Sequence, residues 1–132
     1  MKNITPTHWH AFLDYVMVFT LVGGPWIFTF HESVAATNVS LWSGAAIAGL
    51  SIFTRYEGGL IRVIPMPLHL VMDIVVGLLL MISPFLFDFG EEGNTFHIVS
   101  GLIVLGGGIF TSSKLRKRVP PVEVVDDPQR DH

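Results

Sequence analysis

Cysteine is absent from this chain of 132 residues. Disulfides, thiolate nucleophiles, CxxC redox motifs and cysteine-bound zinc or iron–sulfur centres are therefore excluded. Charge is also scarce, since Asp, Glu, Lys and Arg together make up 14% of the residues and the formal net charge is −3. Nucleic-acid binding depends on Lys and Arg that neutralise phosphates, so we expect no nucleic-acid partner.

Two long stretches contain no Lys or Arg, one between Lys2 and Arg55 and the other between Arg62 and Lys114. Half of the residues are hydrophobic and the mean hydropathy is +0.55, which favours lipid as the solvent. A bilayer core about 30 Å thick is crossed by roughly 20 apolar residues in a helix. We therefore predict an all-α membrane protein whose four transmembrane helices cover residues 10–30, 34–54, 67–87 and 95–113.

The basic residues are distributed on one side of this arrangement. Arg55 and Arg62 flank the middle loop, and a basic cluster at residues 114–118 follows the last helix, whereas the other two loops carry acidic residues and no Lys or Arg. Because Lys and Arg near helix ends are retained in the cytoplasm, we predict that both termini and the middle loop are cytoplasmic. Residues 114–132 are expected to form a basic juxtamembrane segment and a flexible tail.

An internal duplication appears when the chain is shifted against itself by 59 residues. The shift aligns Pro6 with Pro65, His10 with His69, Asp14 with Asp73, Leu21 with Leu80, Pro25 with Pro84, and Phe28 with Phe87. The second helices align at Ser43-Gly44 with Ser100-Gly101 and at Phe53-Thr54 with Phe110-Thr111. We therefore predict two helical hairpins, residues 1–60 and 61–113, as a parallel repeat with a pseudo-two-fold axis along the membrane normal.

The repeated motif resembles that of the SPW repeat proteins, a family of small bacterial membrane proteins named for Ser-Pro-Trp near the end of the first helix of each hairpin. The first copy here reads Gly24-Pro25-Trp26 and the second reads Ser83-Pro84-Phe85. The resemblance covers both hairpins. It implies a bacterial inner-membrane location and a two-hairpin architecture, and it brings no established activity.

In each first helix the shared residues recur at steps of three and four, so they lie on one stripe that should face protein. Pro25 and Pro84 lack an N–H and are expected to bend their helices, with Trp26 and Phe85 at the membrane interface. Small residues in the second helices should allow close packing between helices. They are Ser40, Gly44, Ala48, Gly101 and Gly106 to Gly108.

Asp14 and Asp73 are the most informative residues, because a carboxylate inside a transmembrane helix is costly and is usually paired or functional. His10 and His69 lie one turn earlier, so each imidazole should lie beside its carboxylate. The favoured interpretation is that these pairs are structural and fix helix packing through bonds to His, to Ser or Thr, or to Arg55 and Arg62 of the middle loop. The alternatives are passage of protons or ions, or binding of a metal or a haem by the same four residues.

No arrangement typical of a hydrolase or a phosphate-binding site is present, so we expect no enzyme activity and no cofactor. His8 could compete as a ligand, and His97, which aligns with Ser40, should have an interfacial or hydrogen-bonding role. The sequence therefore predicts a small structural or accessory membrane protein. Its expected partners are the lipid bilayer and either further copies of the chain or another membrane protein.

Overall fold

The computed structural model describes residues 7–56 and 58–111. Within them the chain forms α1 (Thr7–Ile27), α2 (Val34–Phe53), α3 (Met66–Leu86) and α4 (Gly90–Phe110). Each helix has 20 or 21 residues and is long and apolar enough to cross a membrane. This confirms the predicted all-α membrane protein with four transmembrane helices, while the tail predicted for residues 114–132 lies outside the described part.

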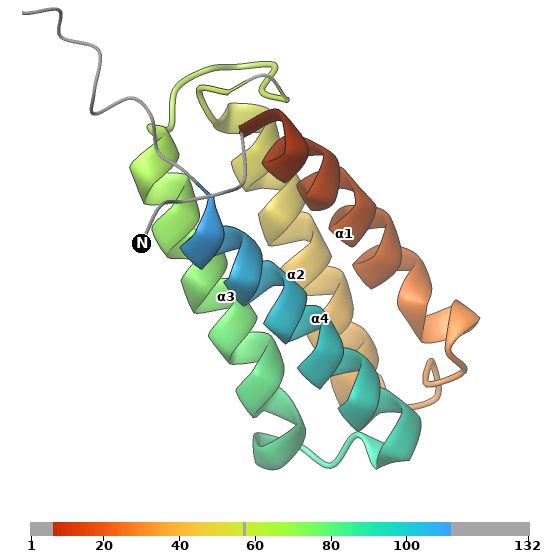
Figure 1. Cartoon of the computed structure of the whole chain (residues 1–132). Helices are drawn as coiled ribbons and strands as arrows, with labels where there is room; N and C mark the ends of the chain where they lie inside the picture. The colour runs from red at the N-terminus through yellow and green to blue at the C-terminus, as the bar shows by residue number, and fades with distance from the viewer. Residues whose placement is uncertain (1–6, 57, 112–132) are drawn as a thin grey trace, which may run out of the picture.

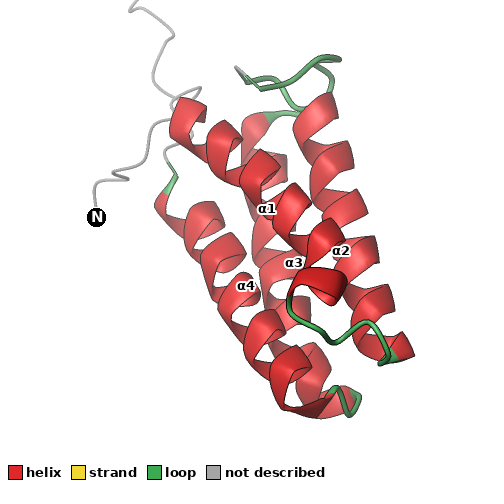
Figure 2. Ribbon diagram, turned by 90° about the vertical axis from the view of Figure 1, so that its right-hand side faces the viewer, coloured by secondary structure: helices red, strands yellow, loops and turns green. Residues whose placement is uncertain are grey.

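The four helices form a bundle in which consecutive helices run in opposite directions (Figure 1). The starts of α1 and α3 and the ends of α2 and α4 gather at one end, which also carries the α2–α3 connection (Figure 2). We call this the inner end, after its predicted cytoplasmic side, and the opposite one the outer end. The bundle therefore brings the same end of both hairpins together, as a parallel repeat requires; the pseudo-two-fold axis itself stays a prediction.

The helix boundaries differ from the predicted ones by up to five residues, and two of the differences have a local cause in the backbone. α1 ends at Ile27 rather than at residue 30, because Thr29 has a φ of 58° and its left-handed backbone cannot continue the helix. α4 begins at Gly90 rather than at residue 95. Gly90 has a φ of 73°, and Glu91 and Glu92 occupy the first turn, where negative charge is favourable beside the N-terminal helix dipole.

Close packing between helices depends on small residues, as predicted. α3 and α4 meet backbone to backbone, since a Cβ added to Gly101 would lie 2.7 Å from the carbonyl oxygen of Gly77. Ser40 and Gly44 of α2 are likewise buried. Large apolar side chains cover the outside of all four helices, which leaves a surface suited to lipid.

Both prolines lie inside their helices, and each frees the carbonyl oxygen four residues earlier. The two freed carbonyl groups find different partners. Ser40 of α2 donates its hydroxyl to the Leu21 oxygen at 2.5 Å, whereas Ser83 of α3 donates to the Leu80 oxygen in its own helix at 2.9 Å. The cost of each proline is thus reduced locally.

Trp26 and Phe85, which follow the prolines, are both exposed on the bundle surface, so the lipid interface can accommodate them. The shared stripe of each first helix is buried as predicted, with one exception. Phe28 and Phe87, the last residues of the stripe, are about half exposed because each follows the end of its helix.

Candidate functional site

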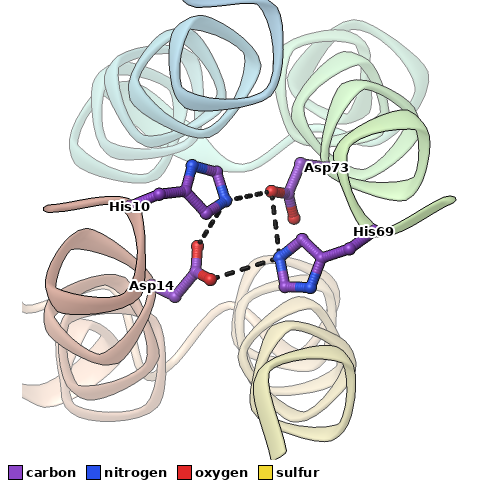
Figure 3. Close-up of side chains that lie close together, drawn as sticks. All are labelled: His10, Asp14, His69 and Asp73. Carbon is purple, nitrogen blue, oxygen red and sulfur yellow. Dashed lines mark hydrogen bonds and ion pairs between the residues drawn. The ribbon is translucent and has the colours of Figure 1, made fainter. Parts of the chain in front are cut away.

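His10, Asp14, His69 and Asp73 meet in the middle of the bundle near its inner end (Figure 3). All four are buried, with at most 5% of any residue exposed. One nitrogen or oxygen atom from each lies within 4.8 Å of the other three. The sequence predicted two separate His–Asp pairs, and the fold brings them together as a single group, which we call the His/Asp cluster.

Each histidine contacts both aspartates. His10 Nε2 lies 2.8 Å from Asp73 Oδ2 and 3.3 Å from Asp14 Oδ1. His69 Nε2 lies 3.2 Å from Asp14 Oδ2 and 3.2 Å from Asp73 Oδ2. One contact of each ring is to the aspartate of its own helix, and the other crosses from one hairpin to the other.

The far side of each ring contacts a threonine at the end of a helix of the other hairpin. His10 Nδ1 lies 2.7 Å from Thr111 Oγ1, and His69 Nδ1 lies 2.6 Å from Thr54 Oγ1. The Thr54 hydroxyl donates its single proton to the Leu50 carbonyl oxygen at 2.5 Å. Its oxygen must therefore accept from His69, which places a proton on Nδ1 of that ring and directs Nε2 at the carboxylates.

Asp14 has two further partners. Ser51 donates to Asp14 Oδ2 at 3.1 Å, and the Tyr56 hydroxyl donates to the same oxygen at 2.7 Å. Burial, followed by the neighbouring Asp14 carboxylate, raises the pKa of the Tyr56 hydroxyl above its ordinary value, so this group stays protonated and donates. Tyr56 comes from the α2–α3 connection, and its ring lies against the rings of His10 and His69, with centroids 6.4 and 5.3 Å apart.

Asp73 is less well satisfied. Its Oδ1 is buried and has no hydrogen-bond partner among the described residues. The repeat explains the difference, because the position that corresponds to Ser51 is Gly108, which has no side chain to donate. A Cβ built there would lie 3.2 Å from the Asp73 Cβ and 2.9 Å from the Leu70 oxygen, so the site has little room for a serine.

The cluster partners were only partly visible in the sequence. Thr54 and Thr111 align in the repeat, and that alignment was the available signal for their matching roles. Ser51 and Tyr56 leave no such signal, because their contacts depend on how α2 and the following connection fold over Asp14. Arg55, considered as a partner for the aspartates, instead donates from Nε to the Arg62 oxygen at 3.2 Å. His8 is exposed and lies outside the cluster.

His97 lies near the outer end, away from the cluster, and is fully buried. Its Nδ1 is 2.7 Å from the Gly93 oxygen, and its Nε2 is 3.1 Å from the Ala36 oxygen. The predicted hydrogen-bonding role is confirmed. The residue connects α4 to α2, and so joins the hairpins at the end opposite the cluster.

An apolar core fills the bundle between the cluster and the outer end. Met17 and Leu21 follow Asp14 along α1, and Val76 and Leu80 follow Asp73 along α3, all buried in one hydrophobic group. Two of the four cluster contacts join the hairpins, and the other two stay within α1 and within α3. Ser40, Ser83 and Ser100 are also buried among the described residues, so the cluster adjoins an interior that is mainly but not wholly apolar.

A separate open groove of about 640 Å³ lies along α1 and α4, and no residue of the cluster lines it. Most of its lining is apolar, with Glu91 and Glu92 among the lining residues at the start of α4. In a bilayer such a surface is compatible with acyl chains.

In comparisons with known proteins, no curated protein and no solved structure matches the chain. A family match does exist: the SPW repeat domain aligns with residues 8–111. That span contains both hairpins and all four residues of the His/Asp cluster. The protein is therefore a multi-pass membrane protein that belongs to the SPW repeat family.

Proposed function

We propose that this protein is a small accessory membrane protein, without enzyme activity, whose two hairpins are held as one rigid unit by the His/Asp cluster. The observation that carries the proposal is that each histidine contacts side chains of the other hairpin. His10 Nε2 lies 2.8 Å from Asp73 and His69 Nε2 lies 3.2 Å from Asp14, and the far nitrogen of each ring lies 2.7 or 2.6 Å from a threonine of the other hairpin. Such bonds stabilise a particular helix arrangement in lipid.

The role we assign to that rigid unit is assembly, either with further copies of the chain or with another membrane protein. A bundle of four short helices offers little interior for a self-contained channel, whereas its apolar outer surface is available to other helices. The distribution of Lys and Arg supports a bacterial inner-membrane location with cytoplasmic termini. Reporter fusions at Glu92 and at the C-terminus test this orientation, and a cytoplasmic signal at Glu92 would contradict it.

Assembly can be tested by measuring the mass of the full chain in lipid nanodiscs and in the native membrane after mild cross-linking. We expect a defined complex larger than the monomer. The matched variant combines Asp14→Asn with Asp73→Asn, which preserves the size of both side chains and removes both charges. If the rigid bundle is the unit that assembles, a smaller fraction of this variant should be found in the complex. A strictly monomeric wild-type chain under both conditions would refute the assembly role.

Passage of protons is a second candidate that the residue types suggest, since His and Asp can relay protons. The apolar core between the cluster and the outer end argues against it. We therefore expect wild-type protein in liposomes to give no proton flux above that of protein-free liposomes. Flux abolished by Asp14→Asn would establish a proton path instead.

A further inference from the structure

Two buried atoms of the His/Asp cluster, His69 Nε2 and Asp73 Oδ1, have no hydrogen-bond partner within residues 7–56 and 58–111. His69 Nε2 nevertheless lies 3.2 Å from a carboxylate oxygen of each aspartate. Because Nδ1 of this ring donates to Thr54, Nε2 carries a lone pair when the ring is neutral. Lone pair and carboxylate oxygens are all acceptors. Their convergence in a buried site is resolved either by a proton on Nε2, which makes the ring an imidazolium, or by a metal cation between these atoms.

We propose that this cation is one divalent transition-metal ion, with Zn²⁺ as the first choice, bound by one atom from each residue of the His/Asp cluster. The inference deepens the proposed function and rests on it, because the ion would join the same two hairpins. Imidazole nitrogen and carboxylate oxygen are ligands that Zn²⁺ commonly takes. The four ligands come from α1 and α3, two from each helix.

The spacing of the ligand atoms fits a tetrahedral ion. Zn–N and Zn–O bonds of about 2.0 to 2.2 Å place neighbouring tetrahedral ligand atoms about 3.3 to 3.5 Å apart. The four nitrogen–oxygen contacts in the cluster measure 2.8, 3.2, 3.2 and 3.3 Å and use both oxygens of Asp14, and one ligand atom from each residue can be chosen so that the four lie within 4.8 Å of one another. A tetrahedral ion can therefore be accommodated when side-chain rotations bring one atom of each residue to this spacing.

Charge and surroundings also favour the ion. Two carboxylates balance a divalent charge, so the loaded centre is neutral, which is the state that costs least inside a membrane. Thr54 and Thr111 hold the far nitrogens of the two rings, as outer partners of metal-bound histidines commonly do. Four protein ligands leave no open position on the metal, which is typical of a structural site rather than a catalytic one.

A haem between the two histidines fits the same residues less well. The centroids of the His10 and His69 rings are 5.3 Å apart, and Asp73 Oδ2 contacts the Nε2 of both rings, at 2.8 and 3.2 Å. A porphyrin placed between the rings would have to displace this carboxylate. The geometry therefore points to a single ion.

The test uses the full chain, purified in mild detergent with an affinity tag that contains no histidine, freed of metal by a chelator and titrated with Zn²⁺ alone. Co²⁺ in a parallel titration reports tetrahedral coordination through its visible absorption. The key variant is His10→Ala/His69→Ala. The matched control is His8→Ala/His31→Ala, which removes two exposed histidines outside the cluster.

We expect one Zn²⁺ per chain in the wild type and in the control, a rise in Tm on loading, a tetrahedral Co²⁺ spectrum, and loss of all three in the key variant. Should that variant fail to fold, Thr54→Val/Thr111→Val retains all four ligands and should weaken Zn²⁺ binding by about 10- to 100-fold. Absence of stoichiometric binding to a folded wild type, or binding that survives in the key variant, would overturn the metal site. A folded, metal-free wild type would leave the proposed accessory function intact, because that proposal is tested by the mass of the complex.

Discussion

At the scale of single residues, the two aspartates show how a duplicated sequence acquires two different environments. Asp14 accepts from Ser51 and Tyr56 in addition to its histidine contacts, whereas Asp73 retains a buried oxygen with no hydrogen-bond partner in the part of the chain that the structure describes. The sequence identified both aspartates and both histidines, since their spacing and repetition are visible in one dimension. Their convergence, and the hydrogen bond from Tyr56 to Asp14, depend on the path of the α2–α3 connection. The hydrophobic period of the sequence does not predict that path.

Tyr56→Phe tests this asymmetry. The substitution removes the donor to Asp14 Oδ2 and leaves a buried carboxylate less satisfied, so we expect a loss of about 1 to 3 kcal/mol in the free energy of unfolding. The only other tyrosine is the control. Tyr15 donates to the Gly58 oxygen at 2.6 Å, outside the cluster, and Tyr15→Phe should cost about 0.5 to 1.5 kcal/mol. Equal losses in the two variants, measured by unfolding in detergent, would argue against a special role for Tyr56.

At the scale of helices, the proline motif explains why the first copy departs from the family signature. Ser83 precedes Pro84 and donates to the carbonyl group that the proline frees. Gly24 occupies the corresponding place in α1, and a Cβ added there would meet the Phe96 ring at a distance that no real side chain tolerates. The bond that a serine would make is supplied by Ser40 of α2 instead.

Gly24→Ser would restore the signature and yet destabilise the protein. We expect a loss of about 1 to 3 kcal/mol in the free energy of unfolding, because the new side chain overlaps Phe96 in a packed core. The clash predicts coupling: the same substitution should cost less when Phe96→Leu makes room for it. A neutral or stabilising Gly24→Ser in the wild-type background would show that packing against Phe96 is not what excludes the serine.

At the scale of the whole molecule, the sequence predicted the number of helices, their membrane character and the buried stripe, because hydropathy and helical period are local properties. It misplaced the end of α1 and the start of α4, where a left-handed threonine and a glycine followed by two glutamates decide the boundary. The sequence could not predict that each histidine would contact residues of the other hairpin. These contacts join residues that lie between 15 and 101 positions apart in the sequence, as in His69 with Thr54 and His10 with Thr111.

The most direct test of the central claim is a double-mutant cycle between His10→Ala and Asp73→Asn, measured by unfolding of the metal-free full chain in detergent. His10 and Asp73 lie on different hairpins and their nearest atoms are 2.8 Å apart. We predict a coupling energy of about 0.5 to 3 kcal/mol for this pair and none for the control cycle of His8→Ala with Asp73→Asn. Coupling between His10 and Asp73 that is no larger than in the control would contradict the claim that the cluster holds the two hairpins together.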